Sequence, residues 1–115
     1  MSANAARLFE LQKTMQIFSG DEEMFYHVRD HGPMWEENGK RKVAKRIAFE
    51  KPFANPPQVS VSFSLLDSSK ASNLRVWVQS EDVSTDQFTI SVSTWGDTRL
   101  SKVRVAWLAH GEPDR

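Results

Sequence analysis

The sequence predicts an all-β domain built as an antiparallel β-sandwich. Five segments between residues 43 and 109 alternate apolar and polar side chains, the period of half-buried strands. The turn-rich clusters PFANPP, DSSKASN, EDVSTD and WGDT separate them. The chain has 115 residues, enough for one hydrophobic core but not for two. Because no helical segment stands between these strands, the order excludes a nucleotide-binding α/β fold.

The composition narrows the classes of partner. Fifteen Lys and Arg balance fifteen Asp and Glu, so there is no general basic field and we expect no nucleic-acid partner. The chain contains no cysteine, which removes thiol chemistry and disulfides. No stretch approaches the roughly 18 apolar residues of a membrane span, so we expect no membrane insertion. The start MSANAARLFELQ lacks the features of a secretory signal, which predicts a cytoplasmic protein or export without such a signal.

Residues 1–18 allow two interpretations. Apolar residues at steps of three, four and three give the stripe of a short helix, namely Leu8, Leu11, Met15 and Phe18. So short a helix must pack on its own domain or on the same helix of other subunits. Alternatively, Met15 to Phe18 already belong to a first strand that ends at Ser19 and Gly20. The segment is therefore either a helix or an extended oligomerisation segment.

Residues 19–42 are predicted to form an ordered loop region, rich in glycine and charge but carrying four large apolar anchors: Phe25, Tyr26, Met34 and Trp35. His27 and His31 have the spacing of metal ligands on a helix, but Gly32 and Pro33 follow at once and no third ligand is evident. We therefore expect solvent-exposed loop histidines and no metal site.

Residues 43–111 form the predicted sandwich. The faces expected to point to the core are Val43, Lys45, Ile47 and Phe49; Val59, Val61, Phe63 and Leu65; Leu74, Val76 and Val78; Phe88, Ile90, Val92 and Thr94; and Val103, Val105, Trp107 and Ala109. The complementary set should face outward: Arg75, Trp77 and Gln79; Thr89, Ser91, Ser93 and Trp95; Arg104 and Ala106.

Two tryptophans and one arginine, Trp77, Trp95 and Arg75, are predicted to face outward, where such side chains usually contact a ligand or another subunit. Trp77 is either buried by another subunit or used as a stacking platform, and Trp95 beside its turn is expected at a site on the rim. The planar fork of Arg75 suits paired hydrogen bonds to hydroxyls or a carboxylate, or else a rim salt bridge. The pattern favours an oligomer whose sheets meet side by side.

No catalytic signature is visible. The sequence has no GxSxG, HExxH or P-loop motif, and Asp67 and Asp97 are loop acids whose separation nothing fixes. We therefore predict a protein that is not an enzyme and uses no cofactor.

Several segments together resemble a known family. Residues 46–59, RIAFEKPFANPPQV, are followed by VSFSLLD, NLRV, TW and VAWLA in the order and spacing of the H-type lectin domain of snail agglutinins and the discoidin C-terminal region. The resemblance covers about residues 43–111. It implies a six-stranded antiparallel β-sandwich that assembles as a trimer or hexamer. It also implies binding of glycans with terminal N-acetylgalactosamine or galactose at clefts between subunits.

The resemblance also implies site residues. Arg75 in NLRV matches the sugar-contacting arginine and Trp95 matches the site aromatic. The best-known members place a histidine after that tryptophan, where this chain has Gly96. In the family an acidic residue of the loop before the first matched strand also contacts the sugar. The candidates for that residue here are Glu36, Glu37 and Asn38. The alternative hypothesis is a non-binding structural or assembly module of the same fold, such as a phage-like tail or surface-fibre subunit.

Overall fold

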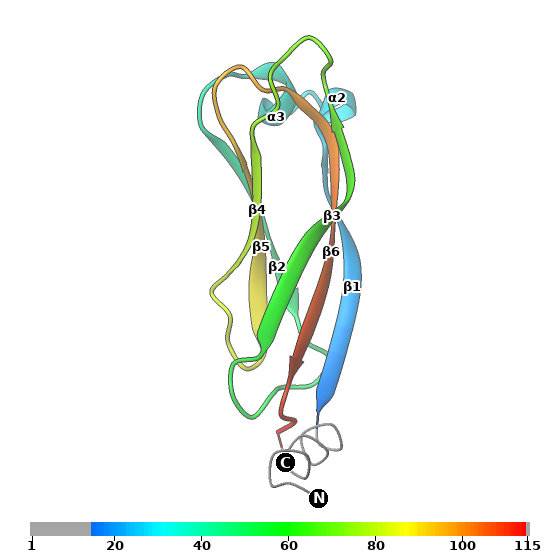
Figure 1. The fold of residues 1–115 in the computed structure, drawn as a ribbon, viewed down its shortest axis with the longest axis vertical. Coiled ribbons are helices and arrows are strands. Elements are labelled where there is room, and N and C mark those ends of the chain that lie inside the picture. The colour runs from blue at the N-terminus through cyan, green and yellow to red at the C-terminus, as the bar shows by residue number, and fades with distance from the viewer. Residues whose placement is uncertain (1–14, 115) are drawn as a thin grey trace, which may run out of the picture.

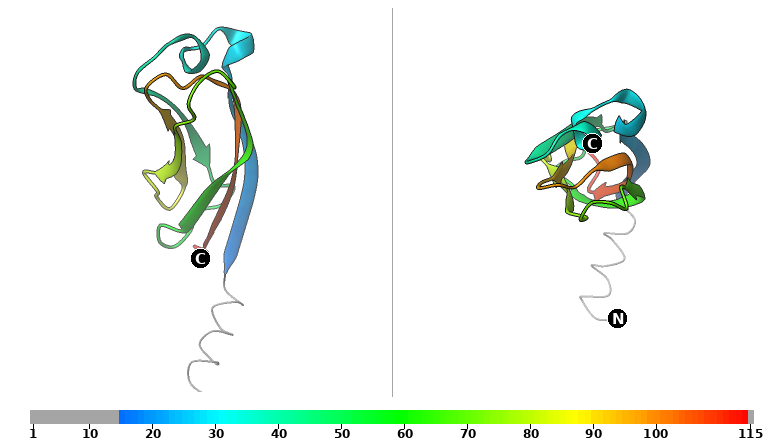
Figure 2. Two further views of the ribbon diagram at one scale, coloured as in Figure 1. Left: turned by 45° about the horizontal axis from the view of Figure 1, so that its top comes forward. Right: turned by 90° about the horizontal axis from the view of Figure 1, so that it is seen from above.

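The computed structural model describes residues 15–114 and confirms a six-stranded antiparallel sandwich (Figures 1 and 2). Sheet A has the order β1-β6-β3, made by β1 (Gln16–Tyr26), β6 (Leu100–Gly111) and β3 (Gln58–Ser68). Sheet B has the order β2-β5-β4, made by β2 (Arg41–Ala48), β5 (Gln87–Thr94) and β4 (Val76–Glu81). Figure 1 shows the two sheets facing each other, with the short helices at one end.

The core lies between the sheets and is made by the inward positions of both. Phe88, Val92 and Val105 are fully buried, as the alternation predicts. Trp107 also packs inward, with its indole 5.3 Å from the Phe88 ring, so its predicted place in the core is confirmed. Leu74 was predicted to face the core and is instead 54% exposed. β4 begins only at Val76, so Leu74 lies in the preceding loop, where strand alternation does not apply.

One glycine makes this packing possible. Gly20 of β1 faces the Trp107 indole, and a β-carbon at position 20 would lie 2.6 Å from Nε1. Such a contact is impossible without displacing the ring. Gly20 therefore leaves the space in which the core tryptophan sits.

β1 corrects the prediction for the N-terminal third. The part of the predicted 1–18 helix that covers residues 1–14 lies outside the described residues, and from Gln16 onward the chain is a strand, as the alternative interpretation predicted. That strand does not end at Ser19 and Gly20: it pairs with β6 as far as Tyr26 opposite Lys102, so the predicted loop over residues 19–26 was wrong.

The reason is cross-strand pairing. Residues 21–23 are acidic and resemble a loop, yet Asp21 and Glu23 reach basic residues of β6 that lie diagonally across the strand pair. Arg104 Nε lies 3.0 Å from Asp21 Oδ1, and Lys102 Nζ lies 3.5 Å from Glu23 Oε1. Opposite charges across a strand pair support pairing that neither segment reveals alone.

The remaining part of the predicted loop contains α2 (His27–Asp30) and α3 (Pro33–Glu36). His31 is exposed as expected, but His27 is not a free loop side chain. Its ring packs on Phe25, and its Nδ1 accepts the N–H of Met34 at 3.2 Å. Burial lowers the pKa of His27. Both helices have four residues, and none in the described part of the chain is long and apolar enough to cross a membrane.

Candidate functional site

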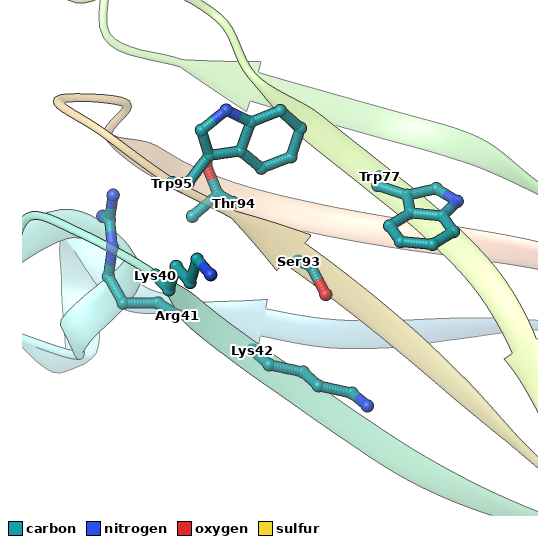
Figure 3. A pocket seen from close by; sticks show the side chains of 7 residues that line it. All are labelled: Lys40, Arg41, Lys42, Trp77, Ser93, Thr94 and Trp95. Carbon is teal, nitrogen blue, oxygen red and sulfur yellow. The ribbon is translucent and has the colours of Figure 1, made fainter.

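The outer face of sheet B carries a hollow of about 330 Å³, which we call the indole hollow. It is lined by Lys40, Arg41, Lys42, Trp77, Ser93, Thr94 and Trp95. Figure 3 shows the two indoles on one side and the two lysines on the other, with Ser93 between them. Trp77 is 57% exposed and Trp95 43% exposed, which confirms their predicted outward orientation.

Strand register brings these side chains together. Lys42 and Trp77 both pair with Ser93, one from each neighbouring strand. Trp95 follows β5 directly, and Arg75 precedes β4 directly. Since Val76 pairs with Thr94, Arg75 and Trp95 come next along the same edge and on the same outer face.

The backbone of Arg75 is held from both sides. Its N–H donates to Thr98 Oγ1 at 3.1 Å, and its carbonyl accepts a hydrogen bond from Thr94 Oγ1. Both threonines are buried. Arg75 therefore leaves the sheet edge at a fixed point beside Trp95.

The side chain of Arg75 forms an exposed ion pair, which we call the arginine–aspartate pair. Nη1 donates to Asp97 Oδ1 at 2.6 Å, and this hydrogen bond lowers the pKa of Asp97. The guanidinium lies against Gly96, where a β-carbon would come within 3.1 Å of Nη1. Gly96 also has a φ of 68°, which favours glycine. Nε and Nη2 of Arg75 make no hydrogen bond to another residue within 15–114.

Arg41 fixes the loops beneath the site. This buried side chain donates to the carbonyls of Gly39 and Thr98, both at 2.8 Å, and of Gly96 at 3.1 Å. Longer contacts reach the carbonyls of Pro33 and Met34. Burial and then the nearby charge of Arg99 lower the pKa of Arg41. One guanidinium thus joins the loop after α3 to the β5–β6 loop.

Glu37 and Asn38 lie in the first of these loops. The N–H of Gly39 donates to the carbonyl of Gly96 at 2.8 Å, so the loop runs beside the β5–β6 loop. Because β5 stands between β2 and β4, this loop and Arg75 lie on opposite sides of Trp95. The structure thus gathers Arg75, Trp95 and Gly96, and leaves Glu37 and Asn38 on the other flank.

A polar network borders the hollow along the sheet. Glu81 accepts hydrogen bonds from Lys42 Nζ at 2.9 Å, from Ser91 Oγ at 2.8 Å, and from Gln79. These bonds, the one from Lys42 first, lower the pKa of Glu81. The network spans all three strands of sheet B and fixes Lys42 at the border of the hollow.

Sequence reasoning missed the roles of Asp97, Arg41 and the two lysines. A partial signal existed for Arg41, because it occupies an inward position of β2, in phase with Val43 and Ile47. A basic residue at an inward strand position needs partners. Asp97 had no such signal, because its place depends on the loop conformation around Gly96.

Comparisons with known proteins agree with this fold. The H-type lectin domain family model matches residues 44–110. A Fuscovulum blasticum protein named ATP synthase subunits region ORF 7 is 34% identical over 104 residues, 90% of each chain. A discoidin-1 chain of Dictyostelium discoideum is 30% identical over 73 residues, covering 63% of this chain and 29% of that protein.

Two solved structures of discoidin II from Dictyostelium discoideum share the fold. They give TM-scores of 0.73 and 0.74 at 19% and 18% identity, and cover 88% and 85% of this chain. This chain spans only 38% and 37% of those chains. The family match extends over more than half of the sequence and includes β2 to β6 almost entirely. The chain therefore belongs to the H-type lectin domain family, whose domains are non-catalytic carbohydrate-binding modules.

Proposed function

We propose that this chain is a lectin for glycans ending in N-acetylgalactosamine or galactose, and that it binds them at clefts between subunits of a homotrimer or hexamer. The observation that carries the proposal is the exposed arginine–aspartate pair beside the indole of Trp95. These three groups stand on one rim, and the strand register and buried threonines hold the arginine in place.

The chemistry of a sugar ring fits these groups. Arg75 keeps N–H donors at Nε and Nη2 that can serve adjacent hydroxyls, and the Asp97 carboxylate accepts hydrogen bonds from hydroxyls. The exposed indole of Trp95 offers an apolar surface for the C–H face of the ring. In galactose-type sugars the axial O4 leaves one ring face apolar, which suits stacking on an indole. Fixed donors, an acceptor and an aromatic surface are the components of a small-ligand site.

A neighbouring subunit would complete the site. The side chains of Arg75 and Asp97 remain 36% and 56% exposed, so this chain supplies one open wall. A second wall would exclude water and strengthen the polar contacts. Several sites on one symmetric assembly would also raise avidity for clustered glycans. Both effects support a cleft between subunits rather than an isolated pocket.

The outer face of sheet A is the surface we propose for packing between subunits. It contains a furrow lined mainly by small side chains, including Ser19, Ser60, Ser62 and Ala106. Leu108 borders it at 40% exposure, and Ile17 on the same face is 58% exposed. Small side chains let a second surface approach closely, and exposed aliphatic groups gain from burial. In a ring of subunits this face of one copy contacts a different surface of its neighbour, so it would stand beside the neighbour's Arg75 and form the second wall of that site.

The test is glycan binding by purified protein, with its mass measured on the same sample by light scattering. Arg75→Ala should weaken binding of galactose or N-acetylgalactosamine at least about tenfold, since charged hydrogen bonds contribute roughly 1.5–3 kcal/mol each. The assembly mass should not change. Arg46→Ala is the matched control, because Arg46 is an exposed arginine on the same face of sheet B. Undiminished binding by Arg75→Ala would contradict the site assignment.

One observation favours the assembly module as a second candidate. Arg75 already has a carboxylate partner within its own chain, so its charge is satisfied without a ligand. A stable trimer that binds no glycan on an array would support that candidate. Leu108→Glu should break the assembly whether the protein is a lectin or a non-binding module, because both hypotheses use the same proposed contact face.

A further inference from the structure

We propose that the indole hollow is a subsite for an anionic group, a carboxylate or a sulfate, attached to the galactose-type sugar that lies against Arg75, either as an acidic sugar linked to it or as a sulfate ester. The inference rests on the proposed function, because it extends the same site. Trp95 belongs to both parts: it lines the hollow and stands beside the arginine–aspartate pair. A single glycan can therefore contact both parts.

The hollow has a mostly apolar surface, and the charged residues around it are all basic. The lining includes Lys40, Arg41 and Lys42 and contains no carboxylate. Lys42 is neutralised by Glu81, and the buried guanidinium of Arg41 points away from the hollow to backbone carbonyls, so its charge lies behind the hollow rather than in it. Lys40 makes no ion pair or hydrogen bond within residues 15–114. This local excess contrasts with a whole chain in which fifteen cations balance fifteen anions.

Nearby acids do not cancel the excess. Asp97 is bound by Arg75, and Glu81 by Lys42. Glu37 acts electrostatically on Arg41, but so does the positive charge of Arg99, whose Nη2 lies 3.5 Å from Oδ1 of Asn38, the residue after Glu37. After these pairings the ammonium of Lys40 is the remaining charge, and it faces the open hollow with Lys42 beside it (Figure 3).

The walls suit a sugar that carries such a group. Two exposed indoles provide apolar surface on one side, and the ammonium groups stand on the other. Ser93 adds a hydroxyl between them. The volume of about 330 Å³ is at the lower end of the range for small-ligand sites. An ammonium group attracts carboxylate and sulfate alike because it acts as a point charge.

The experiment compares three matched glycans by calorimetry: neutral N-acetyllactosamine, its 3′-sialylated form and its 3′-sulfated form. We expect the anionic forms to bind about three- to tenfold more tightly, the effect of one or two partly exposed charge pairs. The gain should shrink in high salt. Lys40→Met should remove most of the gain and leave the affinity for the neutral glycan unchanged.

The matched control is Lys51→Met, which makes the same charge change beyond the opposite end of β2. It should preserve the gain. A gain with only one anion would support the inference and identify the group. Equal affinity for neutral and anionic glycans, or a gain that survives Lys40→Met, would overturn the inference and leave the proposed function standing.

Two other outcomes separate the hypotheses further. If none of the three glycans binds, the proposed function and the subsite both fail. A single-stranded DNA of similar charge provides the last arm: affinity equal to that of the acidic glycans would overturn the subsite, because the hollow would then attract any polyanion.

Discussion

Replacing Arg41 by Met should reveal how far the site depends on one buried guanidinium. Arg41 donates three hydrogen bonds of 3.1 Å or less, to the carbonyls of Gly39, Gly96 and Thr98. Methionine replaces the apolar stem of arginine but has no donors, so it keeps part of the packing and removes the bonds. The loop after α3 and the β5–β6 loop should then separate. The rim around Trp95, which these loops support, should lose its fixed shape as well.

The expected loss of unfolding free energy for Arg41→Met follows from these three hydrogen bonds. Three hydrogen bonds at about 1 kcal/mol each give a loss near 3 kcal/mol. The carbonyl of Gly96 keeps its bond from the N–H of Gly39, so the loss should not greatly exceed this figure. With a urea m-value of about 1.5 kcal/mol/M, the unfolding midpoint should fall by roughly 2 M.

Urea unfolding followed by tryptophan fluorescence measures this shift, and glycan titration measures the site. Arg46→Met is the control, because Arg46 is an exposed arginine of the same strand. We expect the control to unfold like the parent protein. A midpoint shift below about 0.5 M for Arg41→Met, or an equal shift for the control, would refute the reasoning.

Three further changes test other parts of the fold. Gly20→Ala should lower the free energy of unfolding by about 1–3 kcal/mol in urea, because its β-carbon would meet the Trp107 indole at 2.6 Å. Gly96→Ala should lower it by about 1–2 kcal/mol and weaken sugar binding in the same titration, since it strains a φ of 68° and crowds Arg75. The pKa of His27 lies below its ordinary 6.5 in the folded state, so its stabilisation should be complete above that pH and decline as the pH falls toward the folded pKa. An NMR titration that places this pKa above 6.5 would contradict the assignment.

Strand alternation could be read from the sequence because it is a local property. The inward faces around Phe88 and Val105 follow from a period of two, and the structure buries both residues fully. β1 could not be read in the same way. Its residues 19–26 are polar and turn-like, and their pairing depends on partners far away, such as Arg104 at 83 residues from Asp21. A short-range pattern contains no information on such a partner.

The candidate site likewise contains residues that the sequence could predict and residues that it could not. Arg75 and Trp95 follow from alternation, strengthened by the family resemblance. The role of Arg41 does not, because its acceptors are backbone carbonyls, including that of Thr98, 57 residues away. A carbonyl acceptor has no side-chain identity, so no residue type in the sequence marks it. Only the folded loops show that this arginine holds the rim together.

We expect the glycine at position 96 to rearrange the proposed sugar site rather than merely to reduce it. In the best-known members of the family a histidine follows the tryptophan, whereas here the guanidinium of Arg75 lies against the glycine backbone. A side chain at position 96 would need the left-handed conformation and would press on Nη1 at 3.1 Å. The space beside the backbone thus belongs to Arg75, and from there it reaches Asp97. This side of the site therefore offers the carboxylate of Asp97 as an acceptor where the best-known family members offer an imidazole. We expect this chain and those members to prefer different sugars.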